Sequence, residues 1–222
     1  MDRRMVLGGG LSLLAAGTTQ GQVADIRVDR YGRSGAAGTI VLLHGSDGLT
    51  NRGRYEGAAS LIAAASGYQV LLPRYFEATG DSRAHYGEIR SKYPVWAEAL
   101  AAALAEEAGR APLALVGFSL GGALALSLGA QSPRVRAVVN FFGFLPEGLD
   151  QARRLPPTLI LHGDADRVVP VTNAQAIERL LRSRGVPVES RIYPGEGHGL
   201  SRTAFPDALE RAQAFITRYL AA

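Results

Sequence analysis

Ser119 stands between glycines in the stretch LVGFSLGG of residues 115–122. Gly117 and Gly121 complete the pattern G-x-S-x-G, in which a serine occupies a sharp turn between a strand and a helix. Such a turn strains the backbone and lifts the hydroxyl above the sheet, so the residues two positions away on either side must be small. The pattern predicts a nucleophilic serine, although a simple Gly/Ser packing turn would have the same letters.

A serine hydroxyl is a weak nucleophile at neutral pH and needs a base within hydrogen-bond reach. The chain has four histidines. We expect His44 and His162, which each follow a buried strand, to be hydrogen-bonded structural histidines, and His85 to be solvated in a polar loop. His198 lies in the glycine-flanked stretch PGEGHGL after the last predicted strand. It is the predicted base, because this loop is free to reach across the strand ends.

A carboxylate must hold the tautomer of the histidine and offset the charge that its ring acquires. The stretch LHGDADRVVP supplies two, Asp164 and Asp166. Asp164 follows the strand so closely that we expect it to brace the turn, and Asp166 is the predicted partner of His198. The order Ser119, Asp166, His198 along the chain is that of α/β-hydrolases.

Acyl transfer at a serine also needs N–H donors for the oxyanion of the tetrahedral intermediate. The backbone N–H of Leu120, directly after the nucleophile, is one predicted donor. The second is predicted to be the N–H of Ser46 in the stretch HGSDG after an early strand. A plain glycine turn remains an alternative for that stretch, because backbone donors leave no side-chain signature.

The predicted catalytic residues need elements that bring them together. Alternating polar and apolar residues predict an edge strand at 24–31. Apolar and β-branched runs predict further strands at 39–43, 68–72, 113–117, 135–143, 158–161 and 189–193. Helical patterns occupy residues 54–66, 93–109, 120–130, 172–185 and 205–222. This alternation predicts an α/β fold with a mostly parallel sheet covered on both faces, and ligand chemistry beyond the carboxyl ends of the strands.

Residues 1–24 differ from the rest of the chain. A basic start, MDRR, precedes an apolar, glycine-rich stretch and then small polar residues, which is typical of a secretory signal peptide. Arg3 and Arg4 resemble a twin-arginine signal. We therefore expect a periplasmic or secreted protein with one domain at residues 25–222 and no stable membrane insertion of the mature chain. A wrongly assigned start codon or a frayed tail is the alternative.

Composition narrows the chemistry further. The chain has no cysteine, which excludes a thiol nucleophile, disulfides and zinc–thiolate sites. Its formal net charge is +4. No run of Lys or Arg exceeds two residues, and aromatic residues are not interleaved with the arginines, so we expect no nucleic-acid partner.

The chain resembles the dienelactone hydrolase family of α/β-hydrolases through the blocks VLLHGSDGL, GYQVLLPRYF, LVGFSLGGALAL, LILHGDADRVVP and IYPGEGHGL. The resemblance implies an α/β-hydrolase fold, with a mostly parallel central sheet of about eight strands flanked by helices on both faces and no large lid. It also implies hydrolysis of an ester or lactone through an acyl-enzyme, without a cofactor or metal.

The sequence departs from the family pattern at three positions. Founding members use cysteine where this chain has Ser119, and many members have an acidic residue where it has Gly45. Arg74 stands after the stretch LLP, where aspartate is frequent in the family. Either Arg74 or Arg83 is a candidate to pair with a substrate carboxylate, the alternative being a solvated loop arginine. Trp96 is expected to pack within a helix rather than against substrate.

The sequence therefore predicts a serine hydrolase that acts on small carboxylic esters or lactones. A peptidase or an acyltransferase would use the same three residues, and a non-catalytic binding protein would keep the same fold. The sequence does not define the acyl group, the alcohol or the oligomeric state.

Overall fold

The computed structural model describes residues 24–50, 52–107, 109 and 111–221. The predicted signal peptide lies, except for its last residue, outside the described residues and stays a prediction. None of the described helices is long and apolar enough to cross a membrane.

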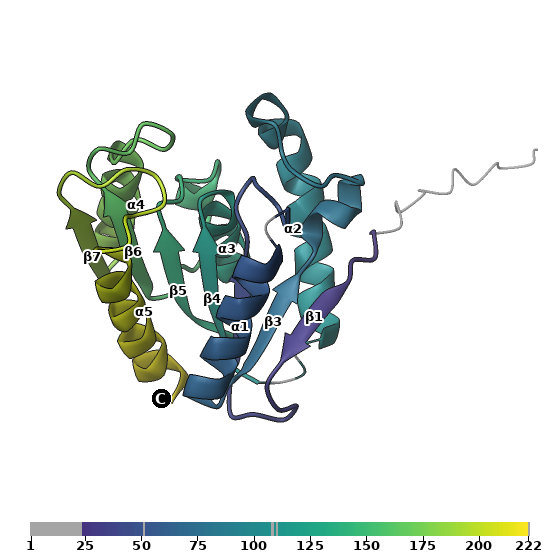
Figure 1. Ribbon diagram of the computed structural model, residues 1–222. Helices are drawn as coiled ribbons and strands as arrows, with labels where there is room; N and C mark the ends of the chain where they lie inside the picture. The colour runs from purple at the N-terminus through teal and green to yellow at the C-terminus, as the bar shows by residue number, and fades with distance from the viewer. Residues whose placement is uncertain (1–23, 51, 108, 110, 222) are drawn as a thin grey trace, which may run out of the picture.

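The described residues form one seven-stranded sheet in the order β1-β3-β2-β4-β5-β6-β7 (Figure 1). The edge strand β1 is antiparallel to β3, and every other neighbouring pair is parallel. The strands are β1 (Val28–Tyr31), β2 (Thr39–Leu43), β3 (Gln69–Pro73), β4 (Leu113–Phe118), β5 (Val135–Phe141), β6 (Thr158–Gly163) and β7 (Val188–Tyr193). The parallel strands therefore deliver their carboxyl ends to one edge of the sheet, as predicted.

Five α-helices in the described residues cover both faces of this sheet (Figure 1). They are α1 (Arg52–Ser66), α2 (Ile89–Glu107), α3 (Leu120–Gln131), α4 (Thr172–Ser183) and α5 (Phe205–Leu220). Buried residues of α2, α3 and α4 belong to one apolar cluster, and those of α1 and α5 belong to a second. The first face thus carries three helices and the second only two.

The continuous apolar runs form fully buried strands, because a parallel strand between two helical layers has no solvent face. All five residues of β2 and all six of β6 are buried. The segment between β3 and α2 contains two short 3₁₀-helices, Tyr75–Thr79 and Tyr86–Glu88.

The structure differs from the sequence predictions in two details. About eight strands were expected and the described residues form seven, because a single antiparallel strand precedes the six parallel ones. Helix α2 begins at Ile89 rather than at residue 93, and Pro94 lies inside it. Trp96 is fully buried in α2 and donates its indole N–H to Thr79 Oγ1 at 2.8 Å, in agreement with a packing role.

Candidate active site

Three side chains from distant parts of the sequence meet beyond the carboxyl ends of β4, β6 and β7. His198 Nδ1 lies 2.8 Å from Asp166 Oδ2, and His198 Nε2 lies 3.0 Å from Ser119 Oγ. When Nδ1 carries the proton and donates it to the carboxylate, Nε2 is free to accept from the serine hydroxyl. The predicted contacts among the three residues are therefore present in the structure.

Ser119 has the strained backbone that the sequence pattern predicts. Its φ is 54° and its ψ is −115°, between the end of β4 and the first residue of α3. A Cβ on Gly117 would lie 2.1 Å from the carbonyl oxygen of Gly121, and a Cβ on Gly121 would lie 2.3 Å from that of Leu43. Only glycine fits at either position, so the two glycines permit the turn that presents the hydroxyl.

Asp166 is held on both of its oxygens. Oδ1 accepts the backbone N–H groups of Val168 and Val169 at 2.8 and 2.9 Å, while Oδ2 faces His198. Burial alone would raise the pKa of Asp166, but these hydrogen bonds, with that of His198 first, outweigh burial and hold the pKa below its usual value. The carboxylate is therefore ionised at neutral pH, although its side chain has no exposed surface.

The loop that carries His198 is fixed against the end of β6. Asp164 Oδ1 accepts the N–H of Gly195 at 2.7 Å, which is the bracing role expected of Asp164. The N–H of Ala165 donates to the carbonyl of Glu196 at 2.9 Å, and the carboxylate of Glu196 accepts both the N–H and the hydroxyl of Ser201. These hydrogen bonds hold the loop in place and thereby fix the distance between the imidazole of His198 and Ser119.

The two predicted oxyanion donors come from the residue after the nucleophile and from the turn after β2. Leu120 is the first residue of α3, where a helix leaves its N–H groups without intrahelical acceptors. Ser46 lines the cavity that also contains Ser119. The helix dipole of α3 adds positive potential at the same point.

Asp47 and Tyr55 are site residues that the sequence analysis missed. The hydroxyl of Tyr55 accepts the N–H of Gly45 at 3.1 Å and donates to Asp47 Oδ1 at 3.2 Å. Burial raises the pKa of Tyr55 to about 12, so the hydroxyl stays protonated. A Cβ on Gly45 would stand 3.0 Å from Asp47 Oδ1 and 3.6 Å from Ser119 Cβ, so the Asp47 carboxylate lies next to the position where many family members have an acidic residue.

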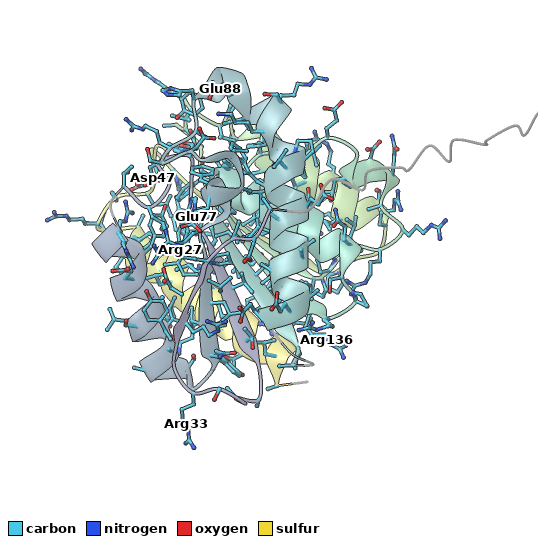
Figure 2. The ribbon with its side chains drawn as sticks, turned by 90° about the vertical axis from the view of Figure 1, so that its right-hand side faces the viewer. Arg27, Arg33, Asp47, Glu77, Glu88 and Arg136 are labelled. Carbon is cyan, nitrogen blue, oxygen red and sulfur yellow. The ribbon has the colours of Figure 1, made fainter. Side chains whose placement is uncertain are left out.

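Figure 2 shows Asp47 toward the end of the molecule at which the parallel strands finish, whereas Arg33 and Arg136 lie at the opposite end. No sequence pattern marked Asp47, because its neighbourhood depends on the fold of the turn and on a hydroxyl from α1.

Of the other three histidines, His44 and His162 are buried in structural positions and His85 is exposed. His44 is buried, its ring stacks on that of Tyr75 at 4.0 Å, and burial lowers its pKa to about 4. His162 is buried and donates from Nε2 to the carbonyl of Val169 at 2.8 Å, and burial lowers its pKa as well. His85 is exposed in the segment before α2. His198 alone among the four contacts Ser119.

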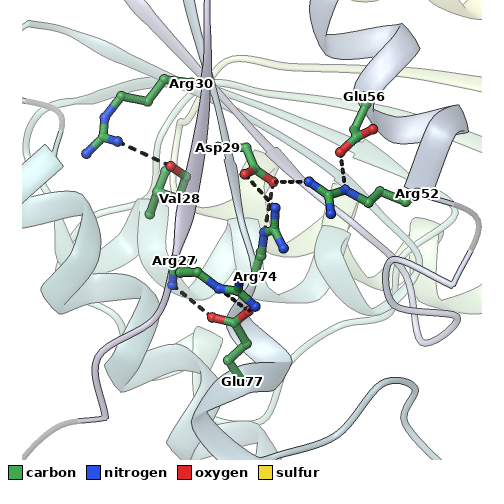
Figure 3. A network of polar contacts seen from close by, with 8 residues as sticks. All are labelled: Arg27, Val28, Asp29, Arg30, Arg52, Glu56, Arg74 and Glu77. Carbon is green, nitrogen blue, oxygen red and sulfur yellow. Dashed lines mark hydrogen bonds and ion pairs between the residues drawn. The ribbon is translucent and has the colours of Figure 1, made fainter.

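The structure does not place the two candidate arginines in the cavity. Arg74 forms a bidentate pair with Asp29 of β1, at 2.9 Å from Nε and 2.7 Å from Nη2 (Figure 3). This pair occupies the guanidinium fork that would bind a substrate carboxylate, and Arg74 does not line the cavity, so its substrate role stays a prediction. Arg83 is exposed and does not line the cavity, and its substrate contact stays a prediction.

A cavity of about 870 Å³ opens at Ser119 and His198. Phe142 forms part of its wall, with φ of 42° and its ring edge-on to that of His198 at 4.9 Å between centroids. Most other lining side chains are apolar and come from α1, α5 and the sheet between them. Among the described residues, no group of three or more His, Asp or Glu side chains is arranged to hold a metal ion.

A strained serine between strand and helix, a histidine and a buried carboxylate at the ends of parallel strands define an α/β-hydrolase. Residues 38–217 match the sequence profile described as the dienelactone hydrolase family, and the chain belongs to that family. The predicted family membership is thus confirmed.

Individual relatives agree with this membership. A carboxymethylenebutenolidase homolog of Xenopus tropicalis is 23% identical over 168 residues, which cover 70% of this chain and 68% of the relative. Acyl-protein thioesterase 1 of Gibberella zeae is 29% identical over 118 residues, which cover 49% of this chain and 48% of the thioesterase. The crystal structure of esterase PE8 superposes with a TM-score of 0.66 at 26% identity, covering 88% of this chain and 100% of that chain.

Proposed function

We propose that this ester-hydrolysing enzyme cleaves carboxylic esters or lactones through an acyl-enzyme formed on Ser119. The observation that carries the proposal is the unbroken series of contacts from Asp166 through His198 to Ser119 Oγ, at 2.8 and 3.0 Å. It is also supported by the backbone of Ser119, because a φ of 54° in a non-glycine residue is a cost that a plain packing turn does not require.

In the proposed reaction, Ser119 Oγ attacks the carbonyl carbon while its proton passes to His198 Nε2. Asp166 keeps the other ring nitrogen protonated and stabilises the imidazolium that forms. The imidazolium then gives its proton to the leaving alkoxide, and the acyl group remains on the serine. Water attacks the acyl-enzyme by the same route, with His198 as base, and releases the acid and free Ser119.

The proposed oxyanion donors are the N–H groups of Leu120 and Ser46. A preorganised donor of this kind typically contributes about 10²–10³-fold to kcat. Tyr55 supports the Ser46 turn, since its hydroxyl accepts the N–H of the preceding residue, Gly45.

Hydrolysis of p-nitrophenyl acetate tests the proposal directly. Wild-type protein is expected to release p-nitrophenol in a burst that equals the enzyme concentration if deacylation is slower than acylation, followed by steady turnover. Ser119→Ala is expected to lose both phases, and Ser60→Ala, at an exposed serine of α1, is expected to keep them. Turnover by the Ser119→Ala variant within tenfold of wild type would reject Ser119 as the nucleophile.

A further inference from the structure

The apolar cavity extends far beyond the space that a small ester would fill. Helix α1 contributes lining residues from Arg54 to Ser66, and α5 contributes them from Phe205 to Thr217. Each pair is twelve positions apart, which at ~1.5 Å per residue is about 18 Å of helix. The cavity is therefore a groove between these helices, running from Ser119 along the sheet toward the amino ends of the strands.

The groove arises from the sparse covering of this face. Of the described helices, only α1 and α5 pack on it, and they flank the central strands in Figure 1. Small side chains leave the space between the two helices unfilled, since Gly57, Ala58 and Ala65 line the groove from α1 and Ala212 lines it from α5. Side chains of Ile40, Leu42, Val116, Phe118 and Phe141 form its floor.

The distribution of charge in the groove is one-sided. Among the described residues that line it, Asp47 and Arg54 are the acidic and basic side chains besides His198, and both lie near the catalytic end. The walls farther along include Ile62 and Ile216, and the distal residues that carry polar atoms, such as Tyr68 and Gln213, are uncharged in type. A ligand in the distal part therefore has apolar walls and no ionic partner.

Two leucines on opposite rims are left unusually open to water. Leu61 of α1 is 72% exposed and Leu209 of α5 is 43% exposed, and both line the groove. A linear apolar chain lying between them would remove both leucines from water and would contact the floor, most of whose side chains are already buried. Apolar pockets of several hundred Å³ that hold a few catalytic polar groups at one end are typical ligand sites.

We propose that the groove binds the acyl chain of the substrate, and that the enzyme prefers esters of medium- to long-chain fatty acids over short-chain esters. This inference rests on the proposed reaction at Ser119, which anchors the carbonyl at the catalytic end. The chain then extends between α1 and α5, and a dodecanoyl group in extended form fits within the length of the groove. The alcohol leaves on the solvent side.

The expected preference follows from the burial of methylene groups. Each fully buried methylene group raises the binding constant about fourfold, and a methylene that remains half exposed in an open groove raises it about twofold. Octanoate has four more methylenes than butyrate, so kcat/KM for its p-nitrophenyl ester is expected to be about 16-fold higher. The measurement uses acetate, butyrate, octanoate and dodecanoate esters below their micelle concentrations.

A matched pair of variants on α1 tests the location of the chain. Ala65 and Ala64 are neighbouring exposed residues, but only Ala65 lines the groove. Ala65→Trp is expected to lower kcat/KM for dodecanoate at least about tenfold while acetate changes less than twofold, and Ala64→Trp is expected to match wild type for both. Leu61→Glu, which puts a charge on the rim, is expected to act like Ala65→Trp.

The outcomes separate this inference from the proposed reaction. Hydrolysis of acetate with no rise along the series would overturn the acyl groove and leave the reaction standing. If no ester is cleaved, the proposed reaction is rejected, and calorimetric titration of Ser119→Ala with dodecanoate then tests the acyl groove by itself. Saturable binding that Ala65→Trp abolishes would support the groove. The absence of binding would overturn it. A dimer that Leu61→Glu dissociates, with chain-length preference unchanged, would assign the groove to a second copy instead and overturn the inference.

Discussion

Replacement of Asp166 by asparagine separates the catalytic from the structural contribution of this carboxylate. An asparagine oxygen at the Oδ1 position keeps the N–H donors of Val168 and Val169, at 2.8 and 2.9 Å in the wild type. Its amide nitrogen then faces His198 Nδ1, where two N–H donors cannot face each other. The ring must take the tautomer with its proton on Nε2, and that nitrogen can no longer accept the proton of Ser119.

The size of the effect follows from these contacts. Loss of the correct tautomer typically lowers kcat by about 10⁴-fold. Because the two backbone bonds are kept, Asp166→Asn is expected to change the free energy of unfolding by less than about 1 kcal/mol. Asp166→Ala leaves two buried N–H groups unpaired at about 1–3 kcal/mol each, so we expect a loss of about 2–6 kcal/mol of stability together with the same loss of kcat.

The assay combines steady-state hydrolysis of a p-nitrophenyl ester with urea unfolding followed by circular dichroism. Asp164→Asn is the matched control, because Asp164 lies two residues before Asp166 and accepts the backbone N–H of Gly195 instead of facing the imidazole. It is expected to keep kcat within a few fold. An Asp166→Asn enzyme that folds normally and retains more than a tenth of wild-type kcat would refute the assignment of Asp166 as the orienting carboxylate.

The same pair of proteins has a defined pH dependence. The folded-state pKa of Asp166 is below its unfolded value, so its contribution to stability is complete above the unfolded pKa, about 3.9, and is lost as pH falls through the folded pKa. Asparagine does not titrate. The stability of wild type relative to Asp166→Asn is therefore expected to be constant above about pH 5 and to fall in more acidic solution. A constant difference down to pH 2 would contradict the lowered pKa.

Three further predictions concern the turn, the β1 edge and export. Gly121→Ala is expected to yield little folded protein, because its Cβ would lie 2.3 Å from a backbone oxygen of β2, whereas Gly53→Ala in α1 meets no atom within 4 Å and is expected to raise stability by about 0.5–1 kcal/mol in thermal melts. Arg74→Gln loses the ion pair with Asp29 of β1 and is expected to lower the melting temperature by a few degrees. Its kcat/KM is expected to change by less than twofold. A large rise in KM with unchanged stability would instead indicate a substrate role for Arg74. We also propose export by the twin-arginine route, for which replacement of Arg3 and Arg4 by lysine is expected to leave precursor in the cytoplasm of the producing cell, as judged by fractionation and immunoblotting, and unaffected export would reject it.

The residues nearest the chemistry were predictable because their constraints are local. The turn at Ser119 needs glycines at fixed offsets, and those offsets are visible in the chain. The choice between Asp164 and Asp166 rested on distance from the strand end, and the structure places the first on the turn and the second on the ring of His198. Alternating strands and helices likewise brought these strand ends to one edge of the sheet.

Other features depend on long-range packing that no local pattern encodes. Arg74 pairs with Asp29, 45 residues away, because β1 adds to the sheet edge beside β3. The groove depends on the separation of α1 and α5, which pack on the same face of the sheet but are far apart in the chain. Its sequence signal is the run of Gly and Ala in α1, which is also compatible with a closely packed helix.

The central claim is that Ser119 is the nucleophile, activated by His198. Reaction of the folded protein with a fluorophosphonate, followed by intact-mass measurement and peptide mapping, tests this claim most directly. The account predicts one covalent adduct per chain on Ser119, formed slowly or not at all in His198→Ala and absent in Ser119→Ala. No adduct on folded wild-type protein, or an adduct on another residue that persists in Ser119→Ala, would contradict it.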